Sequence, residues 1–157
     1  MKKFIIGLVV LMSVLIVGSI YIYQQAHAPY ASAKEESIAY VTDRTDLTQP
    51  DEFYWYNGSE TYFTVKGLTS NNEEMIYIVR QNGGNILSIP AEETLSKEEA
   101  IQQVKSQKNP EKILNATIGM IDGRPIWEIS YRNENRRLGY YIIDLKTGEW
   151  MRTIDNI

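Results

Sequence analysis

Ile126-Trp-Glu-Ile-Ser-Tyr131 and, past an arginine-rich turn, Tyr140-Tyr-Ile-Ile-Asp-Leu-Lys-Thr-Gly-Glu149 decide the fold of this chain. The two stretches are typical of two strands and the turn into a third. A fainter copy lies 64 residues earlier, where Tyr62-Phe-Thr-Val65 matches Ile126-Trp-Glu-Ile129. The sheet that these strands build is therefore expected twice in the chain.

A helical pattern is repeated together with the strands. Lys34-Glu-Glu-x-Ile38-x-x-Val41 recurs as Lys97-Glu-Glu-x-Ile101-x-x-Val104, at an offset of 63 residues. Each copy alone has a core of marginal size, so two copies are expected to support one another. The sequence predicts an α+β protein in which each copy packs one helix on a four-stranded antiparallel sheet.

The expected elements follow from caps, turns and alternation. In the first copy Pro29 begins a helix, Ser32 and Glu35 offer a capping box, and residues 46–51 form a polar connector. The first copy is predicted to contain a helix at about 30–44 and strands at 53–56, 62–66, 75–80 and 86–89. The second is predicted to contain a helix capped by Ser96 and strands at 113–121, 126–132, 138–145 and 150–154. The expected boundaries are 1–27 for a cytoplasmic tip and transmembrane anchor, 28–91 for the first domain and 92–157 for the second.

The N-terminal segment is expected to be a membrane anchor. Residues 4–23 carry no charge and are dominated by Ile, Val and Leu, and about 20 helical residues span a bilayer core. Because Lys2 and Lys3 precede this run, the N-terminus should stay cytoplasmic and the body should lie outside, as a single-pass membrane protein. Ala26-His-Ala28 offers the alternative of a cleaved signal peptide, but the apolar run is long for one and Pro29 would follow the cut.

Several function classes are excluded or disfavoured by composition. The chain has no cysteine and one histidine, His27, which excludes a histidine-based triad, a thiolate metal site and a lipid-modified cysteine. Without Lys2 and Lys3 the 16 basic residues fall to 14 against 20 acidic ones, a net charge of −6. An acidic body disfavours nucleic acid as a partner. We expect no catalytic residues, no metal site and no cofactor.

The second copy resembles a PepSY domain. The residues that carry the resemblance are Ser96-Lys-Glu-Glu-Ala100, Gly123-Arg-Pro-Ile-Trp-Glu-Ile129 and Asp144-x-x-Thr-Gly-Glu149. The whole chain is similar to the YpmB family of Gram-positive bacteria, in which a divergent PepSY-like unit precedes the recognisable one. The resemblance implies two tandem cystatin-like units outside the membrane and a non-enzymatic interaction module. Its expected partner is an envelope protein such as a peptidase or cell-wall hydrolase, which it modulates. The alternative is a sensor or binder of a small ligand or cell-wall polymer at the inter-domain crease.

Strand phase predicts which faces of the sheets are open. In the second copy the turn at Asp122-Gly123 should place Ile118 and Met120 with Trp127 against the helix. Carried back 64 residues, the phase turns three large aromatic side chains away from the first helix: Phe53, Trp55 and Tyr62. Two readings remain open for this aromatic face, packing on the second domain or binding of a partner.

Arg132, Arg136 and Arg137 surround Glu134 in the expected hairpin loop of the second copy. They are suited to an anionic wall polymer or a phospholipid head group, although a solvated polar loop has the same composition. Adjacent carboxylates such as Glu73-Glu74 and Glu98-Glu99 point in different directions and are expected to be solvated rather than to form an acid and base pair.

Overall fold

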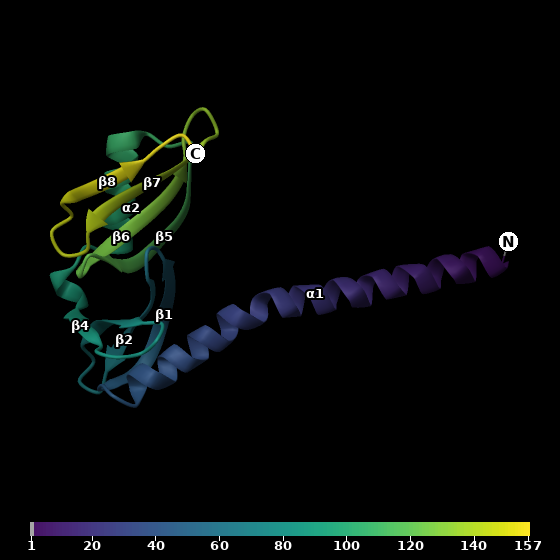
Figure 1. Cartoon of the computed structure of the whole chain (residues 1–157), viewed down its shortest axis with the longest axis horizontal. Coiled ribbons are helices and arrows are strands. Elements are labelled where there is room, and N and C mark those ends of the chain that lie inside the picture. The colour runs from purple at the N-terminus through teal and green to yellow at the C-terminus, as the bar shows by residue number, and fades with distance from the viewer. Residues whose placement is uncertain (1) are drawn as a thin grey trace. The chain divides into compact units, whose positions relative to one another are not determined.

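A computed structural model describes residues 2–157 of the chain (Figure 1), so that Met1 of the expected cytoplasmic tip lies outside the described residues. The first element, α1, is one continuous helix from Lys2 to Thr42. It runs through Pro29, so the separate helix expected from residue 30 is wrong, and Ser32 and Glu35 stand inside a helix instead of at its start. Pro29 removes one backbone hydrogen bond, and helix on both sides tolerates that loss.

The described residues contain one helix, Phe4–Thr42, that is long and apolar enough to cross a membrane, a test that a signal sequence also passes. Among its described residues, the apolar window of this helix has no buried side chain, and Phe4 is 78% exposed. Apolar side chains without a core to join need another apolar medium. The segment therefore has the properties expected of a membrane anchor or a signal sequence.

Two four-stranded antiparallel sheets follow, as the sequence predicts, and each is packed with a helix. The first sheet has the order β1-β2-β3-β4 and the second β5-β6-β7-β8. The strands of the first are β1 (Leu47–Asn57), β2 (Thr61–Thr69), β3 (Glu74–Arg80) and β4 (Leu87–Pro90). The connection contains the short 3-10 helix η1 (Ala91–Glu93) and α2 (Lys97–Lys108). The second sheet consists of β5 (Lys112–Ile121), β6 (Arg124–Arg132), β7 (Leu138–Asp144) and β8 (Trp150–Ile154). The predicted α+β class is confirmed.

Strand β1 begins earlier than the sequence suggests. Of the expected polar connector at 46–51, residues 47–51 are already strand, and Leu47 at the start of β1 is only 2% exposed. The register against β2 shifts between Leu47 and Gln49 and between Pro50 and Glu52. Irregular positions in an edge strand accept a proline, because no ladder hydrogen bond requires its missing N–H. Pro50 therefore does not end the strand.

The last turns of α1 cover one face of the first sheet. Val41 forms a buried cluster with Leu47, Val65 and Tyr77 from three strands, and Ile38 and Phe53 pack against this cluster. Thr45 closes the helix by donating its hydroxyl to the carbonyl of Val41 at 2.8 Å. The helix that carries the apolar segment thus ends inside the core of the first domain.

Helix α2 covers the corresponding face of the second sheet through its buried residues Ala100 and Val104. The predicted two-residue turn is confirmed, since Ile121 pairs with Arg124 and both Asp122 and Gly123 have positive φ. As expected, Ile118 and Trp127 are cross-strand partners in the core with these helix residues.

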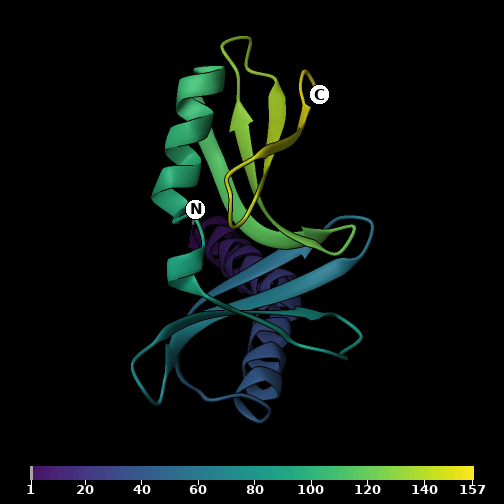
Figure 2. The ribbon, with the colours of Figure 1, turned by 90° about the vertical axis from the view of Figure 1, so that its left-hand side faces the viewer.

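The two sheets meet within one compact unit, residues 37–157. In Figure 2 the first sheet runs across the view and the second runs upward from it, so that their strands cross. One buried cluster contains residues of both domains, among them Tyr54, Ile78, Ile118 and Trp127. The domains therefore share a core.

Candidate functional site at the inter-domain crease

The three aromatic residues predicted to share an open face do not share one. Phe53 and Trp55 are cross-strand partners of Val65 and Phe63, so they lie on the face that α1 covers. Tyr62 pairs with Tyr56 and lies on the opposite face, 7% exposed. The expected common surface of Phe53, Trp55 and Tyr62 is thus wrong, and a role of these residues in partner binding stays a prediction.

The hairpin between β1 and β2 explains the difference. Asn57 pairs with Thr61, so three residues form the loop instead of the expected two. Gly58 donates its N–H to the carbonyl of Glu60 at 3.2 Å, and Thr61 donates its hydroxyl to the Asn57 side chain at 3.0 Å. One extra loop residue moves every side chain of one strand to the other face relative to its neighbour. The β1 side chains that face away from α1, toward the second domain, are therefore Tyr54 and Tyr56.

The face away from α1 packs on the second domain. Tyr54 meets Trp127 edge to face at 5.6 Å between ring centroids, a favoured aromatic geometry. The buried hydroxyl of Thr64 donates to the carbonyl of Ile118 at 3.3 Å. Of the two readings that the sequence left open for this face, the structure supports domain packing, with Tyr54 and Tyr56 in place of Phe53 and Trp55.

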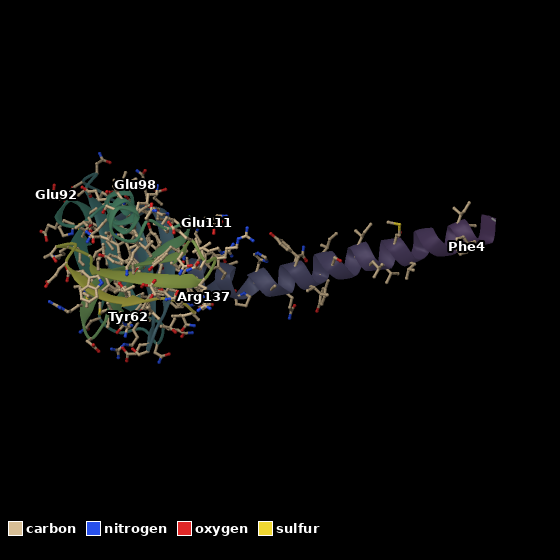
Figure 3. All side chains as sticks on the ribbon, turned by 90° about the horizontal axis from the view of Figure 1, so that it is seen from above. Phe4, Tyr62, Glu92, Glu98, Glu111 and Arg137 are labelled. Carbon is tan, nitrogen blue, oxygen red and sulfur yellow. The ribbon has the colours of Figure 1, made fainter. Side chains whose placement is uncertain are left out.

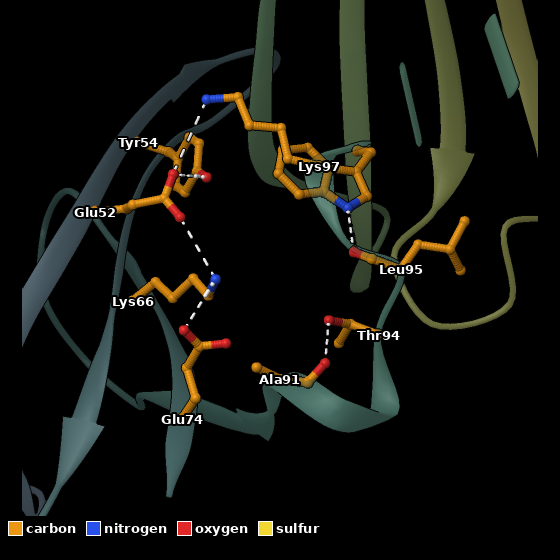
Figure 4. Close-up of polar contacts among 9 residues, drawn as sticks. Glu52, Tyr54, Lys66, Glu74, Ala91, Thr94, Leu95 and Lys97 are labelled. Carbon is orange, nitrogen blue, oxygen red and sulfur yellow. Dashed lines mark hydrogen bonds and ion pairs between the residues drawn. The ribbon is translucent and has the colours of Figure 1, made fainter. Parts of the chain in front are cut away.

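A crease with a volume of about 250 Å³ lies beside this interface, between β1–β3, the connection and the start of α2. A chain of charges crosses it in Figure 4. The Lys66 ammonium lies 3.2 Å from Glu74 and 3.4 Å from Glu52, and Lys97 of α2 lies 3.9 Å from the other oxygen of Glu52. Tyr54 donates its hydroxyl to that same oxygen at 2.5 Å. Glu52 thus joins the two domains.

The protonation states of this network are fixed by its own members. Burial alone raises the pKa of Glu52, but the Tyr54 hydrogen bond and the charges of Lys66 and Lys97 hold it below its ordinary value. Burial, together with the adjacent Glu52, raises the pKa of Tyr54. Burial lowers the pKa of Lys66, and its two carboxylate partners more than offset this, so the pKa is raised. At neutral pH Glu52 and Lys66 are ionised and Tyr54 is neutral.

The connection that closes the crease is held firmly to the second domain. Trp127 donates its indole N–H to the carbonyl of Leu95 at 2.8 Å, and the Leu95 N–H donates to Leu145 at 2.9 Å. Ser96 then caps α2 with Glu99 in a complete capping box, as predicted. The connection is therefore attached to the second domain by hydrogen bonds at Leu95, directly before the capped start of α2.

Glu52, Lys66 and Lys97 did not emerge from the sequence as a site. The signal was present, because Glu52 and Lys66 are cross-strand partners across the first hairpin, but using it requires the length of that loop. Adjacent pairs of carboxylates are a different pattern, and only Glu74 of the pair Glu73-Glu74 joins the network by an ion pair.

The arrangement suits recognition of charged groups. Each of Glu52, Lys66 and Glu74 is held in an ion pair, and the phenol beside them has a raised pKa, so the crease offers fixed charges at neutral pH. Within the described residues, no group of three or more His, Cys, Asp or Glu side chains is placed to hold a metal ion.

Two family models match the chain. Residues 36–80 match the "Cell wall elongation regulator TseB-like domain", and residues 94–152 match the "Peptidase propeptide and YPEB domain", named PepSY. Among curated proteins, the chain is similar to the "Probable cell wall elongation regulator TseB" of Bacillus subtilis (strain 168). The two are 24% identical over 151 residues, which are 96% of this chain and 92% of that protein.

Two solved structures are also similar. The YpmB protein from Bacillus subtilis matches with a TM-score of 0.70 and 24% identity, over 77% of this chain and 95% of that one. A putative lipoprotein from Clostridium difficile 630 matches with a TM-score of 0.41 and 10% identity, over 78% of this chain and 91% of that one. The first match shows the shared fold, and the family models cover most of both domains. The chain is therefore a TseB/YpmB-like protein with a PepSY domain in its C-terminal half.

Proposed function

We propose that this chain is a non-enzymatic, membrane-anchored module outside the cytoplasm that binds an envelope protein and modulates its activity during wall elongation. The partner class that fits best is a peptidase or a cell-wall hydrolase. The name of the similar Bacillus subtilis protein, a probable cell wall elongation regulator, and the description of the PepSY model as a peptidase propeptide domain support this class.

The observation that carries the proposal is that the two domains share one core and form a crease lined by the ionised side chains of Glu52, Lys66 and Glu74. The shared core holds the two domains together, and Lys97 lies 3.9 Å from Glu52 across the crease. A preorganised surface is what a binding module needs, because little conformational entropy is lost on association. The crease is accordingly the surface at which we expect the partner to bind.

The proposal is tested in the bacterium that encodes the chain. Deletion should alter the elongation rate and the width of the cells, and the wild-type gene should restore both. A Lys66→Met variant, which keeps much of the side-chain volume but removes the central charge, should reach normal levels in the membrane and fail to restore elongation. Lys34→Met, at an exposed position of α1 outside the crease, serves as the matched control. Normal elongation in the deletion strain would contradict the proposal.

A second candidate is favoured by the volume and the charges of the crease. A small ligand or a segment of wall polymer is the occupant in this case. Isolated wall polymer should then retain the purified wild-type chain and release the Lys66→Met variant. Retention of both variants to the same extent argues against the crease as the site.

The proposed topology has its own test. Because Lys2 and Lys3 precede the apolar segment, protease added to intact wall-less cells should digest the body and spare the N-terminus. Protection of the body would place it in the cytoplasm and exclude a role in the envelope outside the membrane.

A further inference from the structure

The end of the second domain away from the crease carries an excess of positive charge. We define this basic pole as residues 105–112, 132–138 and 155–157, which are the end of α2 and its connection to β5, the β6–β7 loop, and the last residues of the chain. It contains six basic and three acidic side chains, a net charge of +3, whereas the chain without Lys2 and Lys3 carries −6. Figure 3 looks down on this end and labels Glu111 and Arg137.

Two of the three carboxylates at the pole accept hydrogen bonds from neighbouring side chains. Glu134 accepts a hydrogen bond from the Asn109 side chain at 3.1 Å. Asp155 accepts from Lys108 at 3.1 Å and from the hydroxyl of Tyr131. In the part of the chain that the structure describes, only Lys108 of the six basic residues at the pole forms an ion pair. Four of the other five belong to β5, β6 and the loop after β6, namely Lys112, Arg132, Arg136 and Arg137. These four positive charges are available to an external anion.

Two of the four face each other. Lys112 and Arg132 are direct cross-strand partners of β5 and β6, so their side chains lie on the same face of the sheet. Like charges directly opposite each other destabilise an antiparallel pair. An anion bound between them removes this repulsion, and the pairing is therefore an independent indication of an anionic ligand.

Hydrogen bonds of Asn133 order the backbone of the β6–β7 loop, which carries Arg136 and Arg137. The Asn133 side chain accepts hydrogen bonds from the N–H groups of Asn135 and Arg137, both at 3.0 Å. The Asn133 N–H donates to the carbonyl of Arg137 at 2.9 Å, and Arg136 has a φ of 61°. A non-glycine residue in the left-handed region is uncommon and is held by its surroundings. The backbone of the loop is thus ordered by its own hydrogen bonds.

We propose that the basic pole binds an anionic polymer with repeating phosphate groups. Arginine matches phosphate through two parallel N–H donors, and three of the four available charges are arginines. The residues between Arg132 and Leu138 are Asn, Glu, Asn, Arg and Arg, so the loop has no apolar side chain to insert into a bilayer. The composition of the loop therefore favours a polymer over a lipid surface.

The test uses the full chain in nanodiscs of phosphatidylcholine, with inorganic polyphosphate as the probe. The wild-type chain should bind the probe with an affinity that falls linearly with salt on logarithmic axes, as expected when cations on the protein release counterions from the polymer. The triple variant Arg132→Gln, Arg136→Gln and Arg137→Gln should lose at least about tenfold in affinity and about 2 to 3 units of salt slope.

The matched control changes the same number of charges elsewhere in the second domain. Arg124→Gln, Lys146→Gln and Arg152→Gln, three exposed positions outside both the crease and the pole, should together leave the affinity within about twofold. To separate loss of charge from loss of fold, the three arginines are also changed to lysine. This variant should keep the salt slope, since charge is kept, and bind more weakly than wild type, since the paired donors are lost.

Three results overturn the proposal. They are absence of binding to polyphosphate, equal losses in the arginine triple and its control, and tighter binding to vesicles of phosphatidylglycerol and phosphatidylcholine than to polyphosphate at equal phosphate. The last result reassigns the pole to lipid. The measurement requires only the purified chain, so its outcome is independent of the proposed function in elongation.

Discussion

Gly119 shows how one residue without a side chain joins the two domains. A Cβ atom at this position would lie 2.1 Å from Cγ of Tyr56, so the tyrosine ring rests directly on the backbone of β5. Gly119 belongs to the face of the second sheet that the sequence predicts to point away from α2. The sequence shows a small residue at this position. Glycine is required there because Tyr56 of the other domain packs on it, and the local sequence pattern does not reveal that contact.

Gly119→Ala should destabilise the body by about 1 to 3 kcal/mol, because the added methyl group displaces the Tyr56 ring from a packed interface. Unfolding in denaturant, followed by circular dichroism, measures the change. Asn115→Ala, at an exposed position of the same strand, should change stability by less than about 0.5 kcal/mol. In a Tyr56→Ala background the cost of Gly119→Ala should shrink, and an unchanged cost would show that the ring is not the obstacle.

Glu128 lies on the same face of the second sheet, where its carboxylate interacts electrostatically with Arg152 and with the hydroxyl group of Tyr56. Burial raises the pKa of Glu128, and the attraction of Arg152 offsets this only in part. The folded state therefore binds the proton more tightly than the unfolded state, so this group contributes stability at low pH that is lost as pH rises through the raised pKa.

Glu128→Gln should therefore stabilise the chain at neutral pH, by up to about 1 kcal/mol for a partly buried group with a cationic neighbour. The gain should disappear below the ordinary carboxyl pKa, where both side chains are neutral. Melting temperatures of the variant and the wild type between pH 3.5 and 8 measure this. Glu111→Gln, at an exposed position, is the control. A gain of the same size at every pH would exclude titration of Glu128 as its cause.

At the scale of the element, α2 formed as the sequence predicts because its start signal is complete within four residues. Ser96 accepts a hydrogen bond from the N–H of Glu99, and the Glu99 carboxylate accepts from the N–H of Ser96 at 2.8 Å. In the first copy Ser32 and Glu35 have the same Ser-x-x-Glu pattern without forming a cap, because the apolar segment before them continues the helix. A capping motif starts a helix only where the chain before it is not helical.

Ser96→Ala should cost about 1 kcal/mol of stability, since it leaves a helix N–H without its cap. Ser106→Ala, the same change in the last turns of the same helix, should be neutral or slightly stabilising because alanine is the better helix former. Denaturant midpoints of the two variants check this directly. Equal losses in both would mean that the cap contributes nothing.

The two hairpins mark how far strand phase could be predicted. Asp122-Gly123 forms the expected two-residue turn, so the assignment of Ile118 and Trp127 to the helix face is confirmed. Asn57-Gly58 has the same sequence signal, but Asn57 pairs with Thr61, so the loop consists of the three residues 58–60. The longer loop is stabilised by the hydrogen bonds that Gly58 donates to Glu60 and Thr61 donates to Asn57. The preference of the Asn-Gly dipeptide for a two-residue turn does not predict these hydrogen bonds. The residues of the candidate crease are brought together by this register, so the crease could not be predicted from the sequence for the same reason.

At the scale of the molecule, the repeat made the two domains predictable, whereas their joining depends on residues in which the copies differ. Tyr54, Tyr56 and Tyr62 of the first domain are all at most 7% exposed against a second domain that supplies Gly119 and Ile118. Burying one such ring is worth about 1.5 to 3 kcal/mol, so three rings contribute an amount similar to the whole stability of a small domain. Neither domain is expected to be stable at its full level without the other.

The body should therefore unfold in a single step. The chain has one tryptophan in the first domain, Trp55, and two in the second, Trp127 and Trp150. With fluorotryptophan in place of tryptophan, the three resonances should lose their native signals at the same urea concentration, because a shared core cannot open on one side alone. Gly119→Val, which displaces Tyr56 further than alanine does, should separate the Trp55 midpoint from that of Trp127. Separate midpoints in the unmodified chain would show instead that the shared cluster adds too little free energy to couple the domains.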